Sequence, residues 1–307
     1  MSLPGARNSN CQKGLNKVML NNFKFSRWEI AYRQTGEGKF HLIPNPPYGW
    51  CADPFLVEYH DTIYLFAEIF LYKSERNGVI GYCTYENGRF GAWTVTMDKH
   101  WHLSYPNVFV YEGSLYMCPE SYQKEEVGIY RLIEFPDHWE KVVSLLENGK
   151  YVDTTFLKRE GQEYLFTFQP SFHRYGGVLL QYTIKDCKAL GMQIITEDKS
   201  IARPAGNFIE ESGKLIRVSQ NSSNSYGEGL VFSEIDSLFP KYQEHTVRNV
   251  YPEDILIEGK ERKYVGIHTY NRCRELEVID LKYTCYSLKE WIARKRVRKV
   301  FLNKYGR

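Results

Sequence analysis

One pattern recurs five times along this 307-residue chain. Each copy has a polar or Pro-containing lead-in, a short apolar run, a turn, and a second apolar run that ends on a polar residue. The copies span residues 53–68, 107–120, 154–169, 206–220 and 253–268. Their anchors Phe55, Phe109, Phe156, Phe208 and Ile255 lie 54, 47, 52 and 47 residues apart. A regular period of this length indicates a fold built from repeated units.

Each copy predicts a β-hairpin, because two apolar runs flank a short turn. The turns are marked by His60-Asp61 in the first copy and by Gly113, Gly161, Gly213 and Gly259 in the others. The spacing leaves room for two further strands in each repeat, for example over residues 78–85, 127–132, 178–184 and 229–235. Four strands in each of five repeats predict an all-β fold, a five-bladed β-propeller. A strand over 28–32 is placed to pair with one over 277–281 and so close the ring.

The repeats place the propeller at residues 23–286, between a flexible N-terminal segment (1–22) and a C-terminal tail (287–307). Residues 289–304 read KEWIARKRVRKVFLNK, in which Lys and Arg are interleaved with apolar residues. This pattern predicts a short basic amphipathic helix, which can lie on an anionic membrane surface or bind a partner protein. The alternative is a solvated terminal helix that packs on the propeller.

Composition excludes several classes of protein. Lys and Arg number 40 against 37 Asp and Glu, a near-balance that argues against a nucleic-acid partner. No run approaches the roughly 18 apolar residues of a membrane span, and the seven cysteines are scattered. With no apolar signal core at the N-terminus, a cytoplasmic protein is expected, with the basic tail at the inner face of the membrane as a further option. The chain has no GxGxxG, Walker A, HExxH or GxSxG motif, so no cofactor is predicted, and a channel-bound cation stays open.

The repeat predicts that polar residues meet at one mouth of the central channel. In a propeller the first strand of each blade lines the channel, and the start of that strand lies beside the end of its hairpin partner. The closing residues are Glu68, Glu120, Gln169, Gln220 and His268. The lead-in residues include Asp53, Tyr105, Asn107, Asp153, Arg203, Glu253 and Asp254. These sets predict a ligand-binding mouth, and the alternative is a water-filled channel with structural hydrogen bonds.

Carboxyl groups crowded in a partly desolvated mouth push one another's pKa values apart, which is the basis of acid–base pairs. Asp53, Glu120 and Asp153 are the catalytic candidates. Arg203 can grip a carboxylate or a phosphate, and His268 can carry a proton or donate a hydrogen bond, although either can be purely structural. Trp50 and Trp101 are expected in loops over the mouth, as stacking platforms. The remaining candidate binding residues are Glu68, His102, Tyr105, Gln169, Gln220 and Tyr226.

Several motifs resemble those of known families. Residues 52–68 (ADPFLVEY…YLFAE) are similar to the first blade of glycoside hydrolase family 43, where an Ala-Asp-Pro start supplies the general-base Asp. The stretches HLSYPNVF, YRLIEFPDHW, YVDTTF, RPAGNF and GIHTYN resemble the N-terminal propeller domain of the glucosamine inositolphosphorylceramide transferase family. The resemblance implies a five-bladed fold and a sugar-related role, and it matches Asp53 with the base. The later blades depart from the hydrolase pattern, with Asn107, Gly206 and Gln220 at the lead-in and closing positions.

Three functions are compatible with these features. The first is a carbohydrate-active enzyme of cell-surface polysaccharide biosynthesis, with glycosyltransferase or glycoside hydrolase-like chemistry on a sugar, nucleotide sugar or oligosaccharide. Asp53 is then the general base, Glu120 the general acid, and Asp153 tunes the pair, while Arg203, Gln220 and His268 orient the sugar. The second is a non-catalytic sugar-binding module that assists a partner glycosyltransferase at the membrane. The third is a protein-interaction propeller, which the acid-rich mouth disfavours.

Overall fold

The computed structural model describes residues 24–73, 78–259 and 262–287. The chain divides into two compact units, of which one is Trp28–Lys282. Of the other unit, the structure describes residues 24–27 and 283–287, at the ends of two strands. The predicted N-terminal segment (1–22) and nearly all of the predicted tail (287–307) lie outside the described residues. No helix in the described ranges is long and apolar enough to span a membrane.

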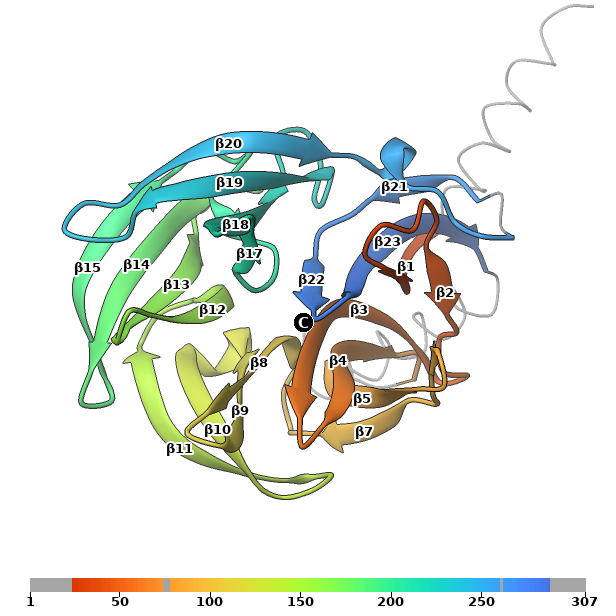
Figure 1. Ribbon diagram of the computed structural model, residues 1–307, viewed down its shortest axis with the longest axis horizontal. Helices are drawn as coiled ribbons and strands as arrows, with labels where there is room; N and C mark the ends of the chain where they lie inside the picture. Colours follow the sequence, from red (N-terminus) through yellow and green to blue (C-terminus); the bar gives the residue numbers. More distant parts are fainter. Residues whose placement is uncertain (1–23, 74–77, 260–261, 288–307) are drawn as a thin grey trace, which may run out of the picture. The chain divides into compact units, whose positions relative to one another are not determined.

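Within the described residues, the strands form five sheets around a central axis (Figure 1). The first sheet holds β3 (Gly49–Tyr59), β4 (Thr62–Leu71), β5 (Gly78–Glu86), β6 (Arg89–Phe90) and β7 (Thr94–Met97). The second holds β8 (Ser104–Tyr111), β9 (Ser114–Glu120), β10 (Glu126–Glu134) and β11 (His138–Glu147), with a 3-10 turn η1 (Tyr122–Lys124). The third holds β12 (Val152–Arg159), β13 (Gln162–Pro170), β14 (Gly177–Lys185) and β15 (Lys188–Thr196).

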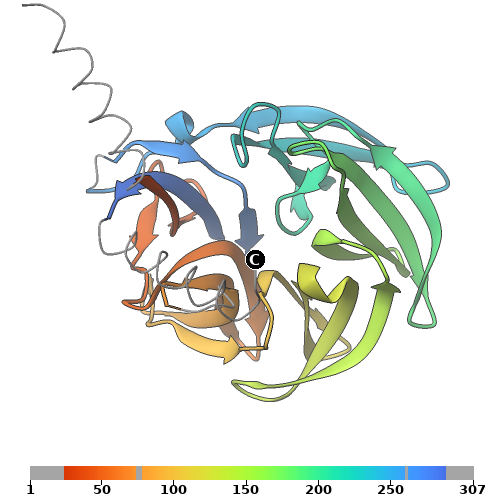
Figure 2. The same ribbon diagram turned by 180° about the vertical axis from the view of Figure 1, so that it is seen from behind.

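The last two sheets complete the ring. The fourth holds β16 (Arg203–Pro204), β17 (Ile209–Glu211), β18 (Lys214–Asn221), β19 (Gly229–Ser237) and β20 (Gln243–Val250). The fifth holds β21 (Tyr264–Gly266), β22 (Tyr270–Cys273), β23 (Leu276–Tyr286), β1 (Lys24–Gln34) and β2 (His41–Ile43), after a 3-10 turn η2 (Pro252–Asp254). Figure 2 shows the same ring from behind. The arrangement confirms the predicted all-β, five-bladed propeller.

Apolar side chains fill the space between neighbouring sheets. Between the first two sheets, Phe55 and Phe66 pack in one cluster with Met117 and Trp139. A central strand is covered on both faces, so its residues are continuously buried and mostly apolar rather than alternating, as in the LFTF run of β13. This packing explains why the repeat is visible as short apolar runs.

The first four predicted hairpins are confirmed. Their turns place both central residues in the left-handed region, as at His60-Asp61 (φ 48° and 59°) and Glu112-Gly113 (φ 48° and 75°). A turn of this kind matches the right-handed twist of the paired strands. The ring closure is also confirmed, because β1 pairs with β23 and joins the start of the chain to its last blade.

The fifth predicted hairpin, over residues 253–268, is wrong. Glu253 and Asp254 lie in η2, and the apolar residue Leu256 is 58% exposed rather than part of an inner strand. The segment instead runs beside Phe40, whose amide donates to the Leu256 carbonyl at 2.8 Å. The fifth inner hairpin is β22–β23, which turns at Arg274 (φ 51°).

The inner strands share a local distortion at the mouth of the channel. Asp53, Tyr105 and Asp153 all have positive φ (52°, 41° and 49°). Each lies where the ladder of its hairpin shifts register, between Ala52 and Phe55 in the first blade, for example. Bulges of this kind turn a side chain away from the regular alternation of a strand. Here the distortion recurs in three blades at the lead-in residue.

Asparagine side chains tie the inner strands together deeper in the channel. Asn107 Nδ2 donates to Asn207 Oδ1 at 2.6 Å, and the Asn207 amide donates to Asn271 Oδ1 at 2.9 Å. Asn271 Nδ2 in turn donates to the Pro54 carbonyl at 2.6 Å. The amide groups thereby join the second, fourth, fifth and first blades and fix the inner strands that carry the mouth residues.

Candidate functional site

Carboxyl side chains from four blades gather at the mouth. The register explains part of this, because Glu68 lies opposite Ala52 and Glu120 lies opposite Ser104, each next to a distorted lead-in. The negative charges of four other carboxyl groups all raise the pKa of Glu68, so the five side chains lie close together. The acidic cluster consists of Asp53, Glu68, Glu120, Asp153 and Asp280.

His268 joins two of these carboxyl groups. Its Nδ1 lies 2.6 Å from Asp280 Oδ2, and its Nε2 lies 3.5 Å from Asp53 Oδ1. Asp280 is fully buried and also accepts the backbone amides of Asp53, His268 and Thr269, each at 3.0 Å. Burial alone lowers the pKa of His268, but the nearby Asp280 and Asp53 carboxylates outweigh it and raise the pKa above its usual value. The imidazole is therefore held in a fixed orientation with a preference for the charged form.

An aromatic wall flanks His268. The Trp28 ring is stacked on the imidazole with centroids 3.9 Å apart, and the Tyr226 ring meets it edge-on at 5.2 Å. Gly227 allows this approach, because a Cβ there would lie 2.9 Å from the His268 side chain. Lys282 Nζ lies 5.7 Å from the centroids of both rings. The wall gives the mouth one apolar side against an otherwise acidic surface.

Glu120, Asp153 and Arg203 form a second group of interacting side chains at the mouth. Glu120 Oε2 accepts the Asp153 amide at 3.1 Å, and Arg203 Nε donates to Asp153 Oδ2. Gln220 Nε2 also donates to Asp153 Oδ2, at 3.1 Å, and the Arg203 guanidinium lies 5.0 Å from the Tyr226 ring centroid. Asp153 is thus occupied by two donors, while Glu120 Oε1 has no hydrogen bond among the described residues.

The environment separates the pKa values of the acids. Burial raises the pKa of Glu120 to about 8, with a further contribution from the charge of Asp153. Burial raises the pKa of Asp53 only to about 6, because the neighbouring His268 opposes it. The pKa of Glu68 also lies well above its usual range, through burial and the charge of Asp53. At neutral pH the mouth thus offers a protonated Glu120 and an ionised Asp53, the two states that acid–base chemistry needs.

The same residues offer ligand atoms for a cation. One atom each of Asp53, His268 and Asp280 lies within 4.8 Å of the others. Carboxylate and imidazole donors suit a divalent metal. The short contact between His268 and Asp280 would have to open for both to bind the ion.

The other predicted aromatic residues differ in how close they lie to the acids, and the Tyr105 amide donates to Asp53 Oδ2 at 3.1 Å. Tyr105 is fully buried, and its hydroxyl contacts Thr155 and Gly206 inside the channel. Trp50 lies in β3 rather than in the predicted loop, because pairing already begins at Gly49, and its ring is stacked on Phe70 at 4.6 Å. Trp101 does lie in a loop, but it packs against the core between the first two blades.

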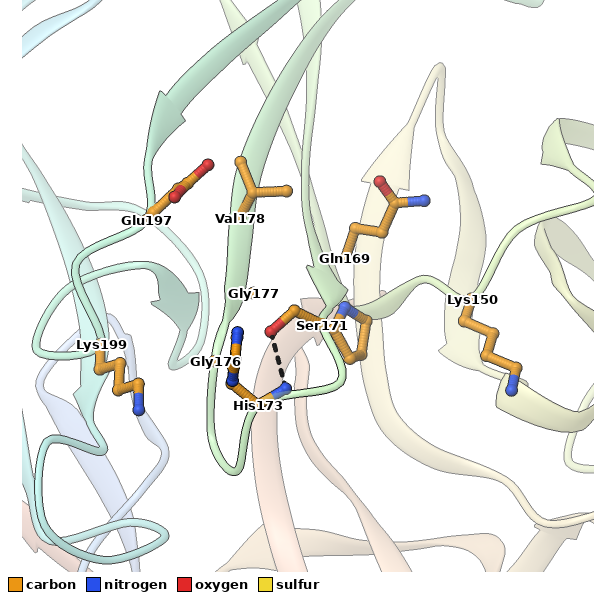
Figure 3. A pocket seen from close by; sticks show the side chains of 10 residues that line it. Lys150, Gln169, Ser171, His173, Gly176, Gly177, Val178, Glu197 and Lys199 are labelled. Atoms are coloured by element: carbon orange, nitrogen blue, oxygen red, sulfur yellow. Dashed lines mark hydrogen bonds between the residues drawn. The ribbon is translucent and has the colours of Figure 1, made fainter.

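Two further predicted residues line the edges of the mouth. His102 lies in the loop before β8, with Nε2 at 3.5 Å from Glu68 Oε1. Gln169, at the end of the third hairpin, lines a separate cavity beside the mouth (Figure 3). The structure therefore brings together Asp53, Glu68, His102, Tyr105, Glu120, Asp153, Arg203, Gln220, Tyr226 and His268. Trp50 packs in one cluster with Trp28 and Tyr226 of the aromatic wall, whereas Trp101 and Gln169 lie apart from the acids.

Asp280 and Trp28 are the site residues that the sequence pattern missed. Asp280 lies in β23, and its amide donates to the Thr269 carbonyl at 3.3 Å, so it occupies the closing position of the true fifth hairpin. The available signal is an Asp within the otherwise mostly apolar run EVIDL, a run that the sequence pattern indicates only as a partner for ring closure. The sequence indicates a ring-closing strand that includes Trp28, but no feature of it predicts the contact between the Trp28 ring and His268.

Fold and site together define a class of protein: a five-bladed propeller with a buried acidic cluster at one mouth. The chain belongs to the family described as "Glucosamine inositolphosphorylceramide transferase 1, N-terminal", which matches residues 41–293. It is 31% identical over 236 residues to glucosamine inositolphosphorylceramide transferase 1 of Oryza sativa subsp. indica, covering 68% of this chain and 31% of that protein. The protein of the same name from Arabidopsis thaliana is 30% identical over 206 residues, covering 62% and 26%. The chain spans about a third of the length of these relatives.

Solved structures share the fold. An α-L-arabinofuranosidase from Podospora anserina in complex with cellotriose superposes with a TM-score of 0.59 at 11% identity, over 82% of this chain and 97% of that one. A family 43 β-xylosidase/α-arabinofuranosidase from a compost metagenome gives a TM-score of 0.56 at 10% identity, over 83% and 95%. At such identity the likeness concerns the fold alone.

Proposed function

We propose that the mouth binds a sugar and acts on it by general acid–base chemistry, with Asp53 as the base and Glu120 as the acid. The observation that carries this proposal is the placement of the two carboxyl groups in one cluster with different neighbours, Asp53 beside His268 and Glu120 beside Asp153. These surroundings raise the pKa of Glu120 further than that of Asp53. A base must be ionised and an acid protonated at the same pH. Two carboxyl groups meet this condition when their surroundings give them different pKa values. The chemistry is glycosyl transfer or glycosidase-like cleavage.

The surrounding residues suit a polyhydroxylated ligand. Gln220 Oε1 is buried and has no hydrogen-bond partner within the described residues, so it can accept a hydroxyl group of the ligand. Arg203 donates a hydrogen bond to Asp153 and so restricts the rotation of that carboxylate. The Tyr226 ring, at the edge of the aromatic wall, offers a surface for a sugar ring. His268 orients Asp53 in this scheme.

The relatives support a sugar as the ligand. Their name describes a glucosamine transferase, and two of the solved propellers contain cellotriose or xylotriose. We further propose a role in cell-surface polysaccharide biosynthesis, in the cytoplasm or at the inner face of the membrane, with a nucleotide sugar or an oligosaccharide as ligand. A cation at Asp53, His268 and Asp280 is compatible with this scheme.

One observation favours a sugar-binding module without catalysis as a second candidate. Both oxygens of Asp53 already accept hydrogen bonds, from the Tyr105 amide and the Thr269 hydroxyl, each at 3.1 Å. With His268 Nε2 also 3.5 Å from Oδ1, three neighbours engage a carboxylate that has about four acceptor sites, which leaves little room for it to take a proton from a ligand. The module would present its glycan to a partner glycosyltransferase.

The test combines binding and turnover on a panel of nucleotide sugars and oligosaccharides. Asp53→Asn and Glu120→Gln should each reduce turnover by at least about 100-fold and leave ligand binding within a few-fold. The exposed Glu147→Gln serves as the control and should change neither. The rate should rise with pH as Asp53 ionises near 6 and fall as Glu120 ionises near 8. Binding without any turnover in the wild type would leave the second candidate, and no binding would refute both.

A further inference from the structure

Three lead-in residues of the inner strands use their backbone amides in the same way. Asp53, Tyr105 and Asp153 have positive φ, and each donates its amide to a carboxyl group of the blade that precedes its own in the ring. The acceptors are Asp280, Asp53 and Glu120, at 3.0, 3.1 and 3.1 Å respectively. A bulge makes this possible, because it turns the amide out of the ladder of its own hairpin. The left-handed lead-ins thus orient the acids of the mouth from blade to blade.

Tyr105 differs from the other two lead-ins, because its side chain carries no charge and extends into the channel. The side chain is fully buried. Its hydroxyl accepts the Gly206 amide at 2.7 Å and lies 2.9 Å from Thr155 Oγ1, and its ring meets the Phe55 ring edge-on with centroids 4.8 Å apart. A residue of the second blade therefore contacts the first, third and fourth blades inside the channel.

The segment that binds the Tyr105 hydroxyl is itself held by the fifth blade. Gly206 follows β16, and the Tyr270 amide of β22 donates to the Ala205 carbonyl at 2.8 Å. Gly206 has a φ of 130°, and a Cβ there would overlap the Tyr270 carbonyl oxygen. The backbone is thus packed too closely against β22 to shift. The hydroxyl of Tyr105 is anchored to a fixed point of the channel.

This anchor bears directly on Asp53. Within the described residues, Asp53 Oδ2 accepts one hydrogen bond, from the Tyr105 amide, whereas Oδ1 accepts one from the Thr269 hydroxyl. A bulky residue with positive φ is strained, and the conformation persists only where the surrounding structure holds it. The contacts of the Tyr105 side chain supply that hold, so they also fix the amide that meets Oδ2.

We propose that Tyr105 is a positioning residue for Asp53. Its hydroxyl, held by Gly206 and Thr155, keeps its backbone amide directed at Asp53 Oδ2 and so sets the orientation of the carboxylate. The catalytic consequence rests on the proposed function, in which Asp53 is the base. Because Tyr105 is fully buried, it acts through Asp53 and not by contact with the ligand.

The first measurement is the steady-state kinetics of Tyr105→Phe, which removes the hydroxyl and keeps the ring. The variant should lower kcat about tenfold and leave KM within about twofold, because a small displacement of a reacting group slows chemistry without weakening binding. Thr155→Val removes one partner of the hydroxyl and should have a smaller effect in the same direction, whereas Thr155→Ser should retain the wild-type rate.

Tyr242→Phe is the matched control. Tyr242 is also buried, and its hydroxyl donates to Glu244 Oε2 at 2.7 Å in the outer part of the fourth blade. Loss of this hydroxyl should lower the free energy of unfolding without a change in kcat. A Tyr105→Phe variant that behaves in the same way would show that the Tyr105 hydroxyl has a structural role alone, and would overturn the proposal.

The second measurement needs no turnover. Hydrogen exchange followed by NMR reports the protection of the amide at position 105, and the amide of Leu165 in the central strand β13 serves as the reference for global stability. In Tyr105→Phe the ratio of the two exchange rates, position 105 over Leu165, should rise at least about tenfold, and in Tyr242→Phe it should stay as in the wild type.

An unchanged ratio in Tyr105→Phe would overturn the proposal whether or not the protein turns over a sugar. If the ratio rises as expected but the wild type shows no turnover, the anchor stands and the proposed function of the mouth falls. Should Tyr105→Phe not fold, the same two measurements on Thr155→Val decide the proposal.

Discussion

Replacing Glu120 by glutamine should make the protein more stable at alkaline pH. In the folded chain the pKa of Glu120 is about 8, against 4.5 for the free side chain. Below about pH 4.5 the group is protonated in both the folded and the unfolded chain, so its contribution to stability is fully present there. As the pH rises to 8, the unfolded chain releases the proton while the folded chain keeps it, and stability is lost.

The size of this loss follows from the shift. A difference of roughly 3.5 pKa units corresponds to about 5 kcal/mol at about 1.4 kcal/mol per unit. This value is a ceiling, because the other carboxyl groups of the cluster share the cost when Glu120 ionises. Glutamine has no proton to lose and keeps an oxygen to accept the Asp153 amide. We therefore expect Glu120→Gln to gain roughly 2 kcal/mol or more over wild type by pH 8.

Urea denaturation at about pH 5 and pH 8 measures the effect as a change in the free energy of unfolding. The difference between variant and wild type should be small at the lower pH and grow toward the higher one. Glu147→Gln, which removes an exposed carboxyl group, should follow the wild type at both. A variant that shows the same pH dependence as the wild type would refute the claim that Glu120 is kept protonated by its surroundings.

Two further predictions test the supports of the site. Asp280→Asn should lower the pKa of His268 measured by NMR titration, because burial is then opposed only by the charges of Asp53 and Asp153. Asp236→Asn, beside the exposed His245, should lower the pKa of His245 and leave that of His268 unchanged. An unshifted His268 in Asp280→Asn would contradict the role of that carboxylate. Asn107→Ala removes the bonds to Asn207 and to the Phe156 amide and should cost about 2–3 kcal/mol of unfolding free energy, whereas Asn249→Ala on the exposed face of β20 should cost almost nothing. Equal effects of the two Asn variants would show that the inner strands do not depend on the amide ties.

The fold could be predicted because the strands of each of the first four blades are consecutive in the sequence. Each of the first four hairpins combines two apolar runs with a turn that accepts positive φ, and both features are visible in a short window. The fifth blade was misassigned because its inner strand, β22, is only four residues long and carries Asn271, Arg272 and Cys273 instead of an apolar run. The stronger apolar signal at 255–257 comes from residues that lie beside Phe40, outside the inner hairpin.

The positions of the site residues could be predicted where they depend on the strand register within one hairpin. Glu68, Glu120 and Gln220 close their hairpins opposite the lead-ins, as the pattern requires. The sequence of a single repeat does not indicate which residues of another blade it contacts. The stacking of Trp28 on His268 therefore could not be predicted, and neither could the contacts of Asp280 with Asp53 and His268. Trp50 lies in a strand rather than in the predicted loop, and its ring stacks on Phe70 and packs in one cluster with Trp28 and Tyr226.

The most direct measurement of the central claim is a crystal structure of the chain with a bound sugar, from soaks with nucleotide sugars and oligosaccharides. The account predicts a sugar ring at the acidic mouth, with a hydroxyl or glycosidic oxygen within hydrogen-bonding distance of Glu120 and a second contact to Asp53 or Gln220. A sugar bound away from Asp53, Glu120 and His268 would contradict it.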